Sequence, residues 1–556
     1  MSERIHVGVA WPYANGPLHL GHIAGAYLPA DIFARYHRLK GNEVLMVSGS
    51  DQHGAPITIR AEQESTTPQA IASRYHAQFL ECWDRLGISF DLFTTTGTAN
   101  HARVAQDMFL TLLDNGYVYR DKMLQGYCPQ CRRFLPDRYL EGTCPYCSSP
   151  KARGDQCDAC GKPMNPSELG DVHCYICGAP ARFEESEHFF LRLSAFQDRL
   201  KAWVSEQTHW RPNTLSTTWK FLDEGLKDRA ITRDIDWGIA VPQQGFEDKR
   251  IYVWFEAVIG YLSASKEWAE SHGGDAAWQA FWQGEAKIFN FIGKDNIFFH
   301  TLIWPAILMG YGGLNLPYDV PANEFLTIEG AKLSTSRNWA VWLPDYLEKY
   351  DPDALRYVLS INMPESRDSD FSWDSFVRRN NDELVATYGN LVHRVLTFTY
   401  RNFNGAVPSP GELDEESRGL ISKAKDTLSE VDRLLYRCSF REALRQAMSL
   451  AQAGNRYLDD QAPWKTIKTD PASSARSVYT VLSLVSVLKT VLYPFLPFSS
   501  DKLHSFLGFE GSVADLGWEF GSPVVGQKLR EPEPLFAKLD DSVIEVETSH
   551  LGHWPG

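Results

Sequence analysis

Eight cysteines, arranged as four Cys-x-x-Cys pairs, lie between positions 128 and 177 of this sequence. Two thiolates separated by two residues can bind the same tetrahedral metal ion. Four such pairs in one short segment of a chain that we expect in the cytoplasm favour zinc over disulfides. All-cysteine zinc sites are closed and structural. We therefore predict two structural Zn²⁺ ions per chain, bound by Cys128, Cys131, Cys144, Cys147, Cys157, Cys160, Cys174 and Cys177.

The composition is that of a globular protein. The chain has 556 residues, of which 44% are hydrophobic and 13% aromatic, so it can bury several cores and a largely disordered chain is excluded. The most apolar stretch, 479–498, contains Lys489, Pro494 and Pro497 and predicts a buried bundle helix rather than a membrane span. The N-terminal residues have no signal-peptide core. We predict a cytoplasmic protein with no membrane partner.

The formal charge of −15 argues against a generic polyanion binder, which would carry an excess of basic residues. A local basic face on an acidic protein can still bind a folded RNA, so the charge does not exclude one.

The hydrophobic pattern indicates a parallel sheet, then an insertion, then helices. An apolar strand at 5–10, a helix over 19–39 and a strand at 44–47 form one βαβ unit, and helices near 68–86 and 101–115 continue it. The cysteine segment interrupts this α/β pattern, which resumes at 251–255 and 288–293. From about 374 to 508 the chain reads as a helical bundle, and a strand is possible at 543–546.

A nucleotide site is indicated after the first strand. Neither a Gly-x-Gly-x-x-Gly nor a Walker-type motif occurs there; His19-Leu-Gly-His22 opens the helix instead. Two histidines three residues apart share one helical face beside the N-terminal amides, where anions bind, and Gly21 leaves room for a flat ring. Asp51 ends the second strand at the same sheet edge. By themselves these residues also fit two surface histidines brought together by chance.

Further motifs make the sequence resemble the class I aminoacyl-tRNA synthetases and, among them, the methionyl-tRNA synthetase family, in an archaeal-like subgroup with two zinc knuckles. Residues 12–22 are similar to the HIGH signature and 331–337 to the KMSKS loop. Residues 252–261 and 291–300 resemble segments that line the methionine pocket, and 455–464 resembles an anticodon-domain segment. The resemblance covers roughly residues 5 to 510 in the family's order, and the blocks around Trp254 and Trp464 are specific to the methionine enzyme.

The resemblance implies an α/β fold: a Rossmann-like parallel-sheet catalytic domain with an inserted zinc-knuckle domain, followed by an α-helical bundle. The expected boundaries are 1–118 and 226–320 for the two halves of the catalytic domain, 119–225 for the insertion, 321–373 for the KMSKS and stem-contact region, and 374–556 for the anticodon-binding domain with its tail.

The implied activity is ATP-dependent activation of L-methionine to methionyl-adenylate, with Mg²⁺-bound ATP as substrate, and transfer to tRNA(Met). The resemblance assigns catalysis to His19, His22, Lys332 and Arg233, and ATP binding to His19, Gly21, His22, Lys332, Ser334, Thr335 and Ser336. It assigns methionine binding to Trp11, Tyr13, Asp51, Trp254, Val258, Tyr261, Asp295 and His300, and anticodon binding to Asn390, Arg394 and Trp464.

The family's nested topology further implies that the inner pairs (Cys144, Cys147, Cys157, Cys160) share one zinc and the outer pairs (Cys128, Cys131, Cys174, Cys177) the other. Sequential pairing, first with second and third with fourth, is the alternative. No appended C-terminal tRNA-binding domain is recognisable, which favours a monomer.

Three residues depart from the family pattern. Thr335 replaces the second lysine of the KMSKS loop, although some archaeal-type members resemble this chain there. Trp11 stands where leucine usually precedes Pro-Tyr, and Val258 stands where proline is usual; both lie beside the expected methionine pocket.

Three other functions compete with this prediction. Another class Ia synthetase is one, but the insertion, at about 100 residues, is too short for the editing domain of the branched-chain enzymes. A paralogue that activates an amino acid without charging tRNA is favoured by Trp11 and Val258 and opposed by the anticodon-like bundle. A non-catalytic tRNA-binding protein would not need His19, His22 and Lys332 together.

Overall fold

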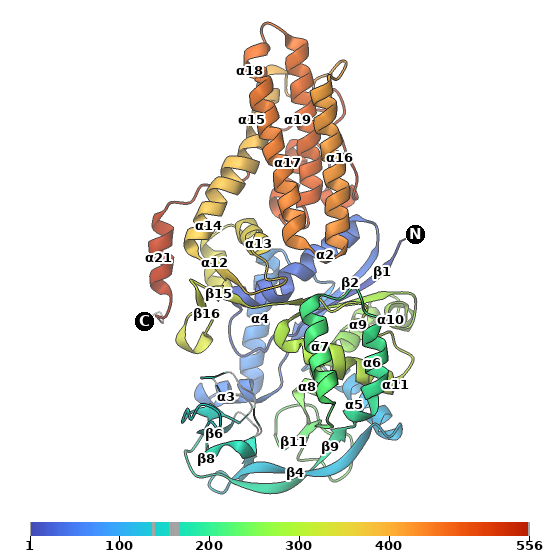
Figure 1. Cartoon of the computed structure of the whole chain (residues 1–556), viewed down its shortest axis with the longest axis vertical. Coiled ribbons are helices and arrows are strands. Elements are labelled where there is room, and N and C mark those ends of the chain that lie inside the picture. The colour runs from blue at the N-terminus through green and yellow to red at the C-terminus, as the bar shows by residue number, and fades with distance from the viewer. Residues whose placement is uncertain are drawn as a thin grey trace.

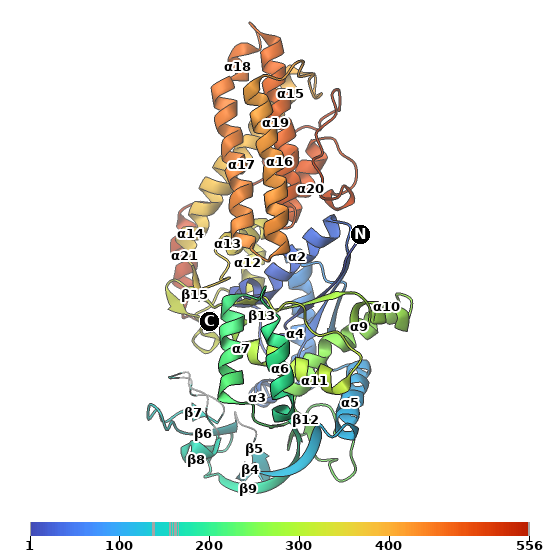
Figure 2. The ribbon, with the colours of Figure 1, turned by 45° about the vertical axis from the view of Figure 1, so that its right-hand side comes forward.

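A computed structural model describes residues 2–135, 139–154, 157, 159–160, 164 and 166–553. The molecule is elongated, with a helical bundle at one end, a parallel sheet in the middle and the cysteine-rich insertion at the other end (Figures 1 and 2). The predicted order of sheet, insertion and bundle is confirmed.

The central sheet has five parallel strands in the order β14-β13-β1-β2-β3. The chain adds β2 and β3 on one side of β1, and β13 and β14 on the other. The carboxyl ends of β1 and β13 therefore flank a topological switch point, where open α/β sheets bind ligands. The strands are β1 (Arg4–Val9), β2 (Glu43–Ser50), β3 (Leu92–Thr95), β13 (Lys287–Gly293) and β14 (Ala322–Asn323).

Both faces of this sheet are buried, which explains why its strands are apolar runs rather than alternating patterns. Val7 and Val9 of β1 pack with α2, whereas Leu45 and Val47 of β2 pack with α5, α9 and α11. The helices of the first half are α1 (Leu20–His22), a π-helix (Ile23–Tyr27), α2 (Leu28–Leu39), α3 (Ala55–Gln63), α4 (Pro68–Leu86) and α5 (Ala99–Asp114). Those of the second half are α8 (Val253–Glu256), α9 (Gly260–Glu270), α10 (Asp275–Trp282), a π-helix (Phe299–Ile303) and α11 (Trp304–Tyr311), with 3₁₀ turns at Ala257–Ile259 and Lys294–Asn296.

The insertion contains two antiparallel sheets, ordered β10-β9-β4-β5 and β7-β6-β8, so it is a separate structural layer from the parallel sheet. Its strands are β4 (Val118–Cys128), β5 (Arg133–Leu135), β6 (Leu140–Thr143), β7 (Ala152–Arg153), β8 (Gly170–Cys174), β9 (Arg182–Leu191) and β10 (Arg229–Ala230). Helices α6 (Gln197–Ser205) and α7 (Pro212–Glu224) and the hairpin β11 (Thr232–Arg233) and β12 (Arg250–Ile251) lead back to the sheet, with 3₁₀ turns at Pro166–Glu168 and Leu193–Phe196.

A small stem follows, and the bundle stands on it (Figure 1). The stem comprises β15 (Leu326–Ile328), β16 (Ala331–Lys332), β17 (Ser369–Phe371), a 3₁₀ turn (Thr335–Arg337), α12 (Leu343–Lys349), α13 (Pro352–Ile361) and α14 (Trp373–Arg379). The bundle comprises a π-helix (Asn380–Gly389), α15 (Asn390–Asn402), α16 (Glu415–Tyr436), α17 (Phe440–Gln461), α18 (Pro463–Thr466), α19 (Pro471–Leu492) and α20 (Pro497–Phe506).

Helix α19 is the apolar stretch that the sequence analysis assigned to a bundle. Within the described residues it alone is long and apolar enough to cross a membrane, but 89% of its apolar window is buried inside the protein. Burial on all sides explains a helix that is hydrophobic all round, so the bundle prediction is confirmed.

The C-terminal segment returns from the bundle to the catalytic half and ends in α21 (Ser542–His550), after a 3₁₀ turn at Val513–Asp515. The strand predicted at 543–546 is therefore wrong. Helix α21 packs on α14, and its Glu547 accepts hydrogen bonds from Lys349 Nζ (2.9 Å) and Tyr350 Oη (2.8 Å). These tertiary contacts override the β propensity of the Val543-Ile-Glu-Val546 stretch.

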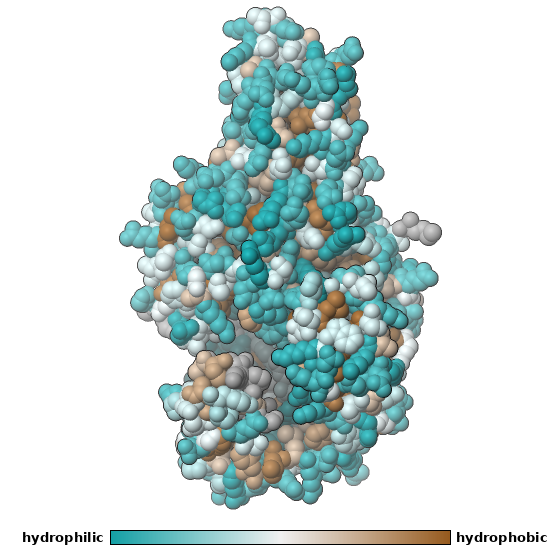
Figure 3. Space-filling view, in the orientation of Figure 1, coloured by the Kyte–Doolittle hydropathy of each residue, from teal (hydrophilic) through white to brown (hydrophobic). Residues whose placement is uncertain are grey.

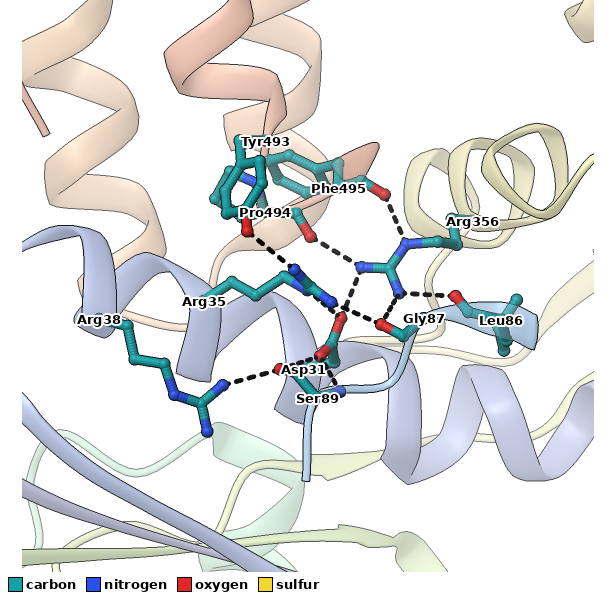
Figure 4. Close-up of polar contacts among 10 residues, drawn as sticks. All are labelled: Asp31, Arg35, Arg38, Leu86, Gly87, Ser89, Arg356, Tyr493, Pro494 and Phe495. Carbon is teal, nitrogen blue, oxygen red and sulfur yellow. Dashed lines mark hydrogen bonds and ion pairs between the residues drawn. The ribbon is translucent and has the colours of Figure 1, made fainter. Parts of the chain in front are cut away.

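A buried charged cluster joins the catalytic half, the stem and the bundle (Figure 4). Asp31 of α2 is fully buried and accepts from Arg356 Nη2 (2.6 Å), Arg35 Nε (2.9 Å) and both N and Oγ of Ser89. Arg356 of α13 also donates to the carbonyls of Leu86, Gly87, Pro494 and Phe495, at 2.8–3.4 Å. A guanidinium has five N–H donors, and all five have an acceptor here.

Candidate functional site

The two histidines of the first motif lie face to face at the start of the first helix. His19 is the N-cap of α1, where its Nδ1 accepts from His22 N while His22 Nδ1 accepts from His19 N (3.3 Å). Their rings stack at a centroid distance of 3.7 Å. Burial lowers the pKa of His22 to about 4; burial and then the charge of His22 lower that of His19 well below its ordinary value. Both imidazoles are therefore neutral near pH 7 and offer hydrogen bonds rather than charge.

Gly21, between these histidines, lies in close packing. A methyl group on Gly21 would lie 3.1 Å from the ring of His19 and 3.2 Å from Leu333 of the 331–337 loop. The helix start is also fastened to the chain beyond that loop, because Leu20 N donates to Val341 O (3.1 Å) and Leu343 N to Leu18 O (2.8 Å). The glycine thus allows the loop to approach the two histidines closely.

A cavity of about 1200 Å³ opens at this point. It is lined by His19 and His22 on one side and by Thr335, Ser336 and Asn338 of the loop on the other. The space-filling view shows the surface hollowed between the insertion and the body of the molecule (Figure 3). The carboxyl edge of the parallel sheet thus faces an open cavity large enough for a nucleotide.

Two distant parts of the chain complete the cavity wall. The insertion contributes Arg153 and Tyr175, whose guanidinium and ring lie 3.7 Å apart. The C-terminal segment contributes Glu547 and His550, and Gly552 N donates to Asn338 O of the loop (3.0 Å). These residues carry no local sequence signal, because only tertiary structure brings them to the site.

The residues predicted to bind methionine form a second group at the same sheet edge. Trp254 stacks on Phe299 (4.4 Å) and meets the ring of Tyr13 edge-on (6.3 Å), and Tyr13 pairs with Asp51 across the strand ends. Tyr261 Oη is hydrogen-bonded to His300 Nε2 (2.7 Å).

These side chains are deeply placed. Tyr261, His300, Val258 and Asp51 are buried, and Asp51 is only 3% exposed. Burial, and then the charge of Glu256, raise the pKa of Asp51 well above its ordinary value, whereas burial lowers that of His300 to about 4. Among the described residues no lysine or arginine forms an ion pair with Asp51, so a cationic ligand would be its natural counterion.

Trp11 turns its indole into a slot made by two glycines. A methyl group on Gly260 would lie 2.7 Å from Trp11 Cε2 and Cζ2, and one on Gly49 would lie 2.3 Å from Trp11 Cζ3 and 2.5 Å from Thr94 O. The indole also lies 6.2 Å from the ring of His101. A large residue at position 11 is thus accommodated because positions 49 and 260 carry no side chain.

Four predicted residues stand apart from these groups. Arg233 lies over the ring of Tyr252 (3.8 Å) and donates to the backbone of its own hairpin. Asp295 lies exposed in the 3₁₀ turn after β13, where partial desolvation by the surrounding protein raises its pKa. Lys332 is exposed on β16, and neither it nor Ser334 lines the cavity.

At the far end of the bundle the three anticodon candidates lie on neighbouring helices. Asn390 is exposed at the start of α15. Arg394, one turn on, lies 4.9 Å over the ring of Trp464 and pairs with Asp459 (2.6 Å). Trp464 is 42% exposed and borders a cavity of about 320 Å³ together with Arg394.

The cysteines form two clusters with the nested pairing. Cys128, Cys131, Cys174 and Cys177 make one cluster, and Cys144, Cys147, Cys157 and Cys160 the other. The Sγ–Sγ distances of 3.5–4.0 Å match the edge of a tetrahedron with Zn–S bonds of about 2.3 Å, which is roughly 3.8 Å. Both clusters can hold zinc, and the sequential pairing is excluded.

Comparison with known proteins decides the family. A sequence profile described as "tRNA synthetases class I (M)" matches residues 5–396, and one described as "Anticodon binding domain of methionyl tRNA ligase" matches residues 407–552. The methionine–tRNA ligase of Dehalococcoides mccartyi strain CBDB1 is 62% identical over 552 residues, covering 99% of this chain and 100% of that protein. The chain belongs to the methionyl-tRNA synthetase family.

Other relatives agree with this membership. The methionine–tRNA ligase of Roseiflexus sp. strain RS-1 is 53% identical, with 99% of each chain covered. The structure of Mycobacterium tuberculosis methionyl-tRNA synthetase in complex with methionyl-adenylate is similar with a TM-score of 0.80 and 27% identity, covering 96% of this chain and 100% of that one. Full-length similarity to named ligases supports the methionine–tRNA ligase prediction over another class Ia synthetase and over an activating paralogue.

One further group of buried residues lies beside those predicted to bind methionine and was not predicted from the sequence. Glu256, His53 and His101 form a buried chain of hydrogen bonds behind Asp51. The available signal was a single acidic residue in the apolar block Val253-Trp-Phe-Glu-Ala-Val258, which a buried helix accepts only when the charge is paired. The partners could not be read from the sequence, because they lie 203 and 155 residues away.

Proposed function

We propose that this chain catalyses both steps of methionine–tRNA ligation. The carboxylate oxygen of methionine attacks the α-phosphorus of Mg²⁺-bound ATP, and pyrophosphate leaves. A terminal ribose hydroxyl of tRNA(Met) then attacks the carbonyl carbon, and AMP leaves. The observation that carries this proposal is the stacked His19–His22 pair facing the 335–338 loop across one cavity at the switch point of a parallel sheet.

His19 and His22 stabilise the α-phosphate during attack. Because both rings are neutral, they act as preorganised hydrogen-bond donors at a phosphate whose charge is already partly balanced by Mg²⁺. Thr335 and Ser336 provide hydroxyls on the opposite wall, and Gly21 keeps that space open. Lys332 reaches the departing pyrophosphate by movement of the exposed loop, together with Ser334.

The buried group around Asp51 binds methionine. The α-ammonium pairs with the Asp51 carboxylate, which has no other cationic partner among the described residues. Tyr13, Trp254, Tyr261 and His300 surround the thioether, whose polarisable sulfur packs well against aromatic edges. Trp11 and Val258 shape the pocket wall, and Arg233 and Asp295 bind substrate at its rim.

The far end of the bundle binds the anticodon. A base from an unstacked loop can stack on the exposed ring of Trp464, while Asn390 and Arg394 read its edges. Arg394 would exchange its pairing with Asp459 for contacts with RNA.

Each cysteine cluster holds one structural Zn²⁺, giving two per chain, and when bound the metal fixes the fold of the knuckles. We further propose that the protein acts as a monomer in the cytoplasm.

Two assays on the purified chain test the function. Methionine-dependent ATP–pyrophosphate exchange and charging of tRNA(Met) should both occur, and leucine, isoleucine, valine and cysteine should support neither. Exchange without charging would instead indicate an activating paralogue, and tRNA binding without exchange would indicate a non-catalytic binder.

A further inference from the structure

Glu256 lies at the centre of a buried ionic chain behind the methionine pocket. It belongs to α8, next to Trp254 and Val258, and its side chain is fully buried. Its Oε1 accepts from His53 Nδ1 (2.7 Å) and its Oε2 accepts from His101 Nε2 (2.5 Å). Each carboxylate oxygen thus accepts a hydrogen bond from a different imidazole. An amide or a hydroxyl at this position has only one acceptor oxygen, so it could not give each imidazole its own acceptor.

The two imidazoles connect Glu256 to different parts of the pocket. His53 follows Asp51 by two residues, and its backbone N donates to Asp51 Oδ1 (3.0 Å). His101 lies on α5, where its Nδ1 meets Ser263 Oγ of α9 (2.8 Å). Through these hydrogen bonds, Glu256 connects the turn after β2 with the helices that carry the aromatic side chains of the pocket.

The charged groups around Glu256 leave the carboxyl group of Asp51 available to a cationic ligand. Burial alone would raise the pKa of Glu256, but His53 and His101 more than offset it and hold that pKa at about 2. Glu267, which faces His101 from α9, accepts instead from Thr94 Oγ1 (2.8 Å). Glu256 is thus the ionised carboxylate of the group and accepts hydrogen bonds from both imidazoles, while among the described residues no lysine or arginine forms an ion pair with Asp51.

We propose that Glu256 is a positioning residue for the ammonium group of methionine: it fixes His53, and through the backbone of His53 it aims the Asp51 carboxylate at the substrate. This inference rests on the proposed role of Asp51. It predicts a defect that depends on the ammonium group of the ligand and not on the side-chain pocket.

Glu256→Gln tests this with little change of volume, because the amide keeps one acceptor oxygen and places an NH₂ group against the second imidazole. Dissociation constants are measured for methionine, for methioninol, which keeps the ammonium group, and for 4-(methylsulfanyl)butanoate, which lacks it. We expect methionine and methioninol to bind at least 10-fold more weakly, and 4-(methylsulfanyl)butanoate and ATP to change by less than 2-fold.

Two further variants make the result unambiguous. Glu267→Gln removes a neighbouring carboxylate from the same helical region and should leave all four constants unchanged. Asp51→Asn should weaken methionine and methioninol strongly; if it does not, the proposed ammonium site itself is wrong. If Glu256→Gln does not fold, His53→Gln provides the same test, because His53 lies at the edge of the cluster and is 8% exposed.

The inference is overturned if Glu256→Gln weakens methionine and 4-(methylsulfanyl)butanoate equally, since the residue would then only maintain the shape of the pocket. It is also overturned if all ligands bind normally. A lower melting temperature with unchanged ligand discrimination would likewise overturn it, because Glu256 would then stabilise the fold without positioning the substrate.

Discussion

Replacing Arg356 with methionine should destabilise the protein by about 3–5 kcal/mol, the usual cost of removing one partner of a buried ion pair. Methionine fills much of the volume but donates no hydrogen bond. Asp31 keeps Arg35 and Ser89, yet it loses its shortest charged contact, 2.6 Å. The carbonyls of Leu86, Pro494 and Phe495 lose the donor that Arg356 provides, and each unsatisfied buried carbonyl costs about 1 kcal/mol or more, which places the effect toward the upper end.

Urea unfolding followed by circular dichroism measures the effect, with Arg38→Met as the matched control. Arg38 lies on α2, the helix of Asp31, and donates to Ser89 Oγ (2.7 Å; Figure 4). It also pairs with Asp91, but both of these side chains are about 30% exposed, so the loss of Arg38 should cost no more than about 1 kcal/mol. An Arg356→Met protein within 1 kcal/mol of the wild type would refute the view that this cluster holds the three parts together.

The pH dependence gives a second check. Burial would raise the pKa of Asp31, but Arg35, Arg356 and Ser89 together hold it well below its ordinary value. A depressed pKa in the folded state contributes stability above the unfolded pKa, about 3.9, and this stability is lost as the pH falls. In Arg356→Met the pKa of Asp31 in the folded state moves back up. Because the unfolded state is the same for both proteins, the stability difference from wild type should narrow as the pH falls through this raised folded-state pKa. A difference that stays constant down to the lowest pH at which both proteins remain folded would mean that Asp31 does not sense Arg356.

Three further outcomes are expected. Trp464→Ala should weaken tRNA charging by the roughly 1–3 kcal/mol of one stacked base and leave pyrophosphate exchange near normal; a parallel loss of both would make Trp464 a structural residue. Lys332→Ala should slow single-turnover adenylate formation at saturating ATP by at least 10²-fold, or roughly 3 kcal/mol, with methionine affinity little changed; a normal rate would remove this lysine from the mechanism. Elemental analysis should find two zinc ions per chain, and Cys144→Ser with Cys157→Ser should remove one of them, whereas loss of both would mean that the two clusters depend on each other.

The sequence was sufficient for the parts of the fold that depend on local periodicity. The βαβ unit, the four Cys-x-x-Cys pairs and the bundle follow from apolar spacing and cysteine spacing, which are properties of neighbouring residues. The nested grouping of those pairs into two clusters was implied only by the family resemblance. The helix after His19 was predicted as one regular segment, but its Ile23–Tyr27 turn is a π-helix, and such bulges leave no apolar pattern of their own.

Tertiary contacts account for what the sequence could not reveal. Val543 and Val546 have strand propensity, yet Glu547 fixes the segment as a helix through Lys349 and Tyr350 of a different element. The Glu256 chain and the Arg356 cluster depend on partners more than 130 residues away in the sequence. The exposed position of Lys332 likewise could not be predicted from the motif, because motif spacing places a residue in a loop but does not define the conformation of that loop.

The glycine slot around Trp11 constrains the order in which this pocket can evolve. The three atoms nearest to a methyl group on Gly260 all belong to the indole, so a smaller residue at position 11 would remove the contacts that oppose Gly260→Ala, and the substitution is harmful before that change. Position 49 has no such freedom, because the carbonyl of Thr94 would still lie 2.5 Å from the new methyl group. Substitution of the two glycines is therefore limited by different parts of the structure. Replacement of Gly260 depends on which residue occupies position 11, whereas replacement of Gly49 is opposed by the backbone carbonyl of Thr94 whatever that residue is.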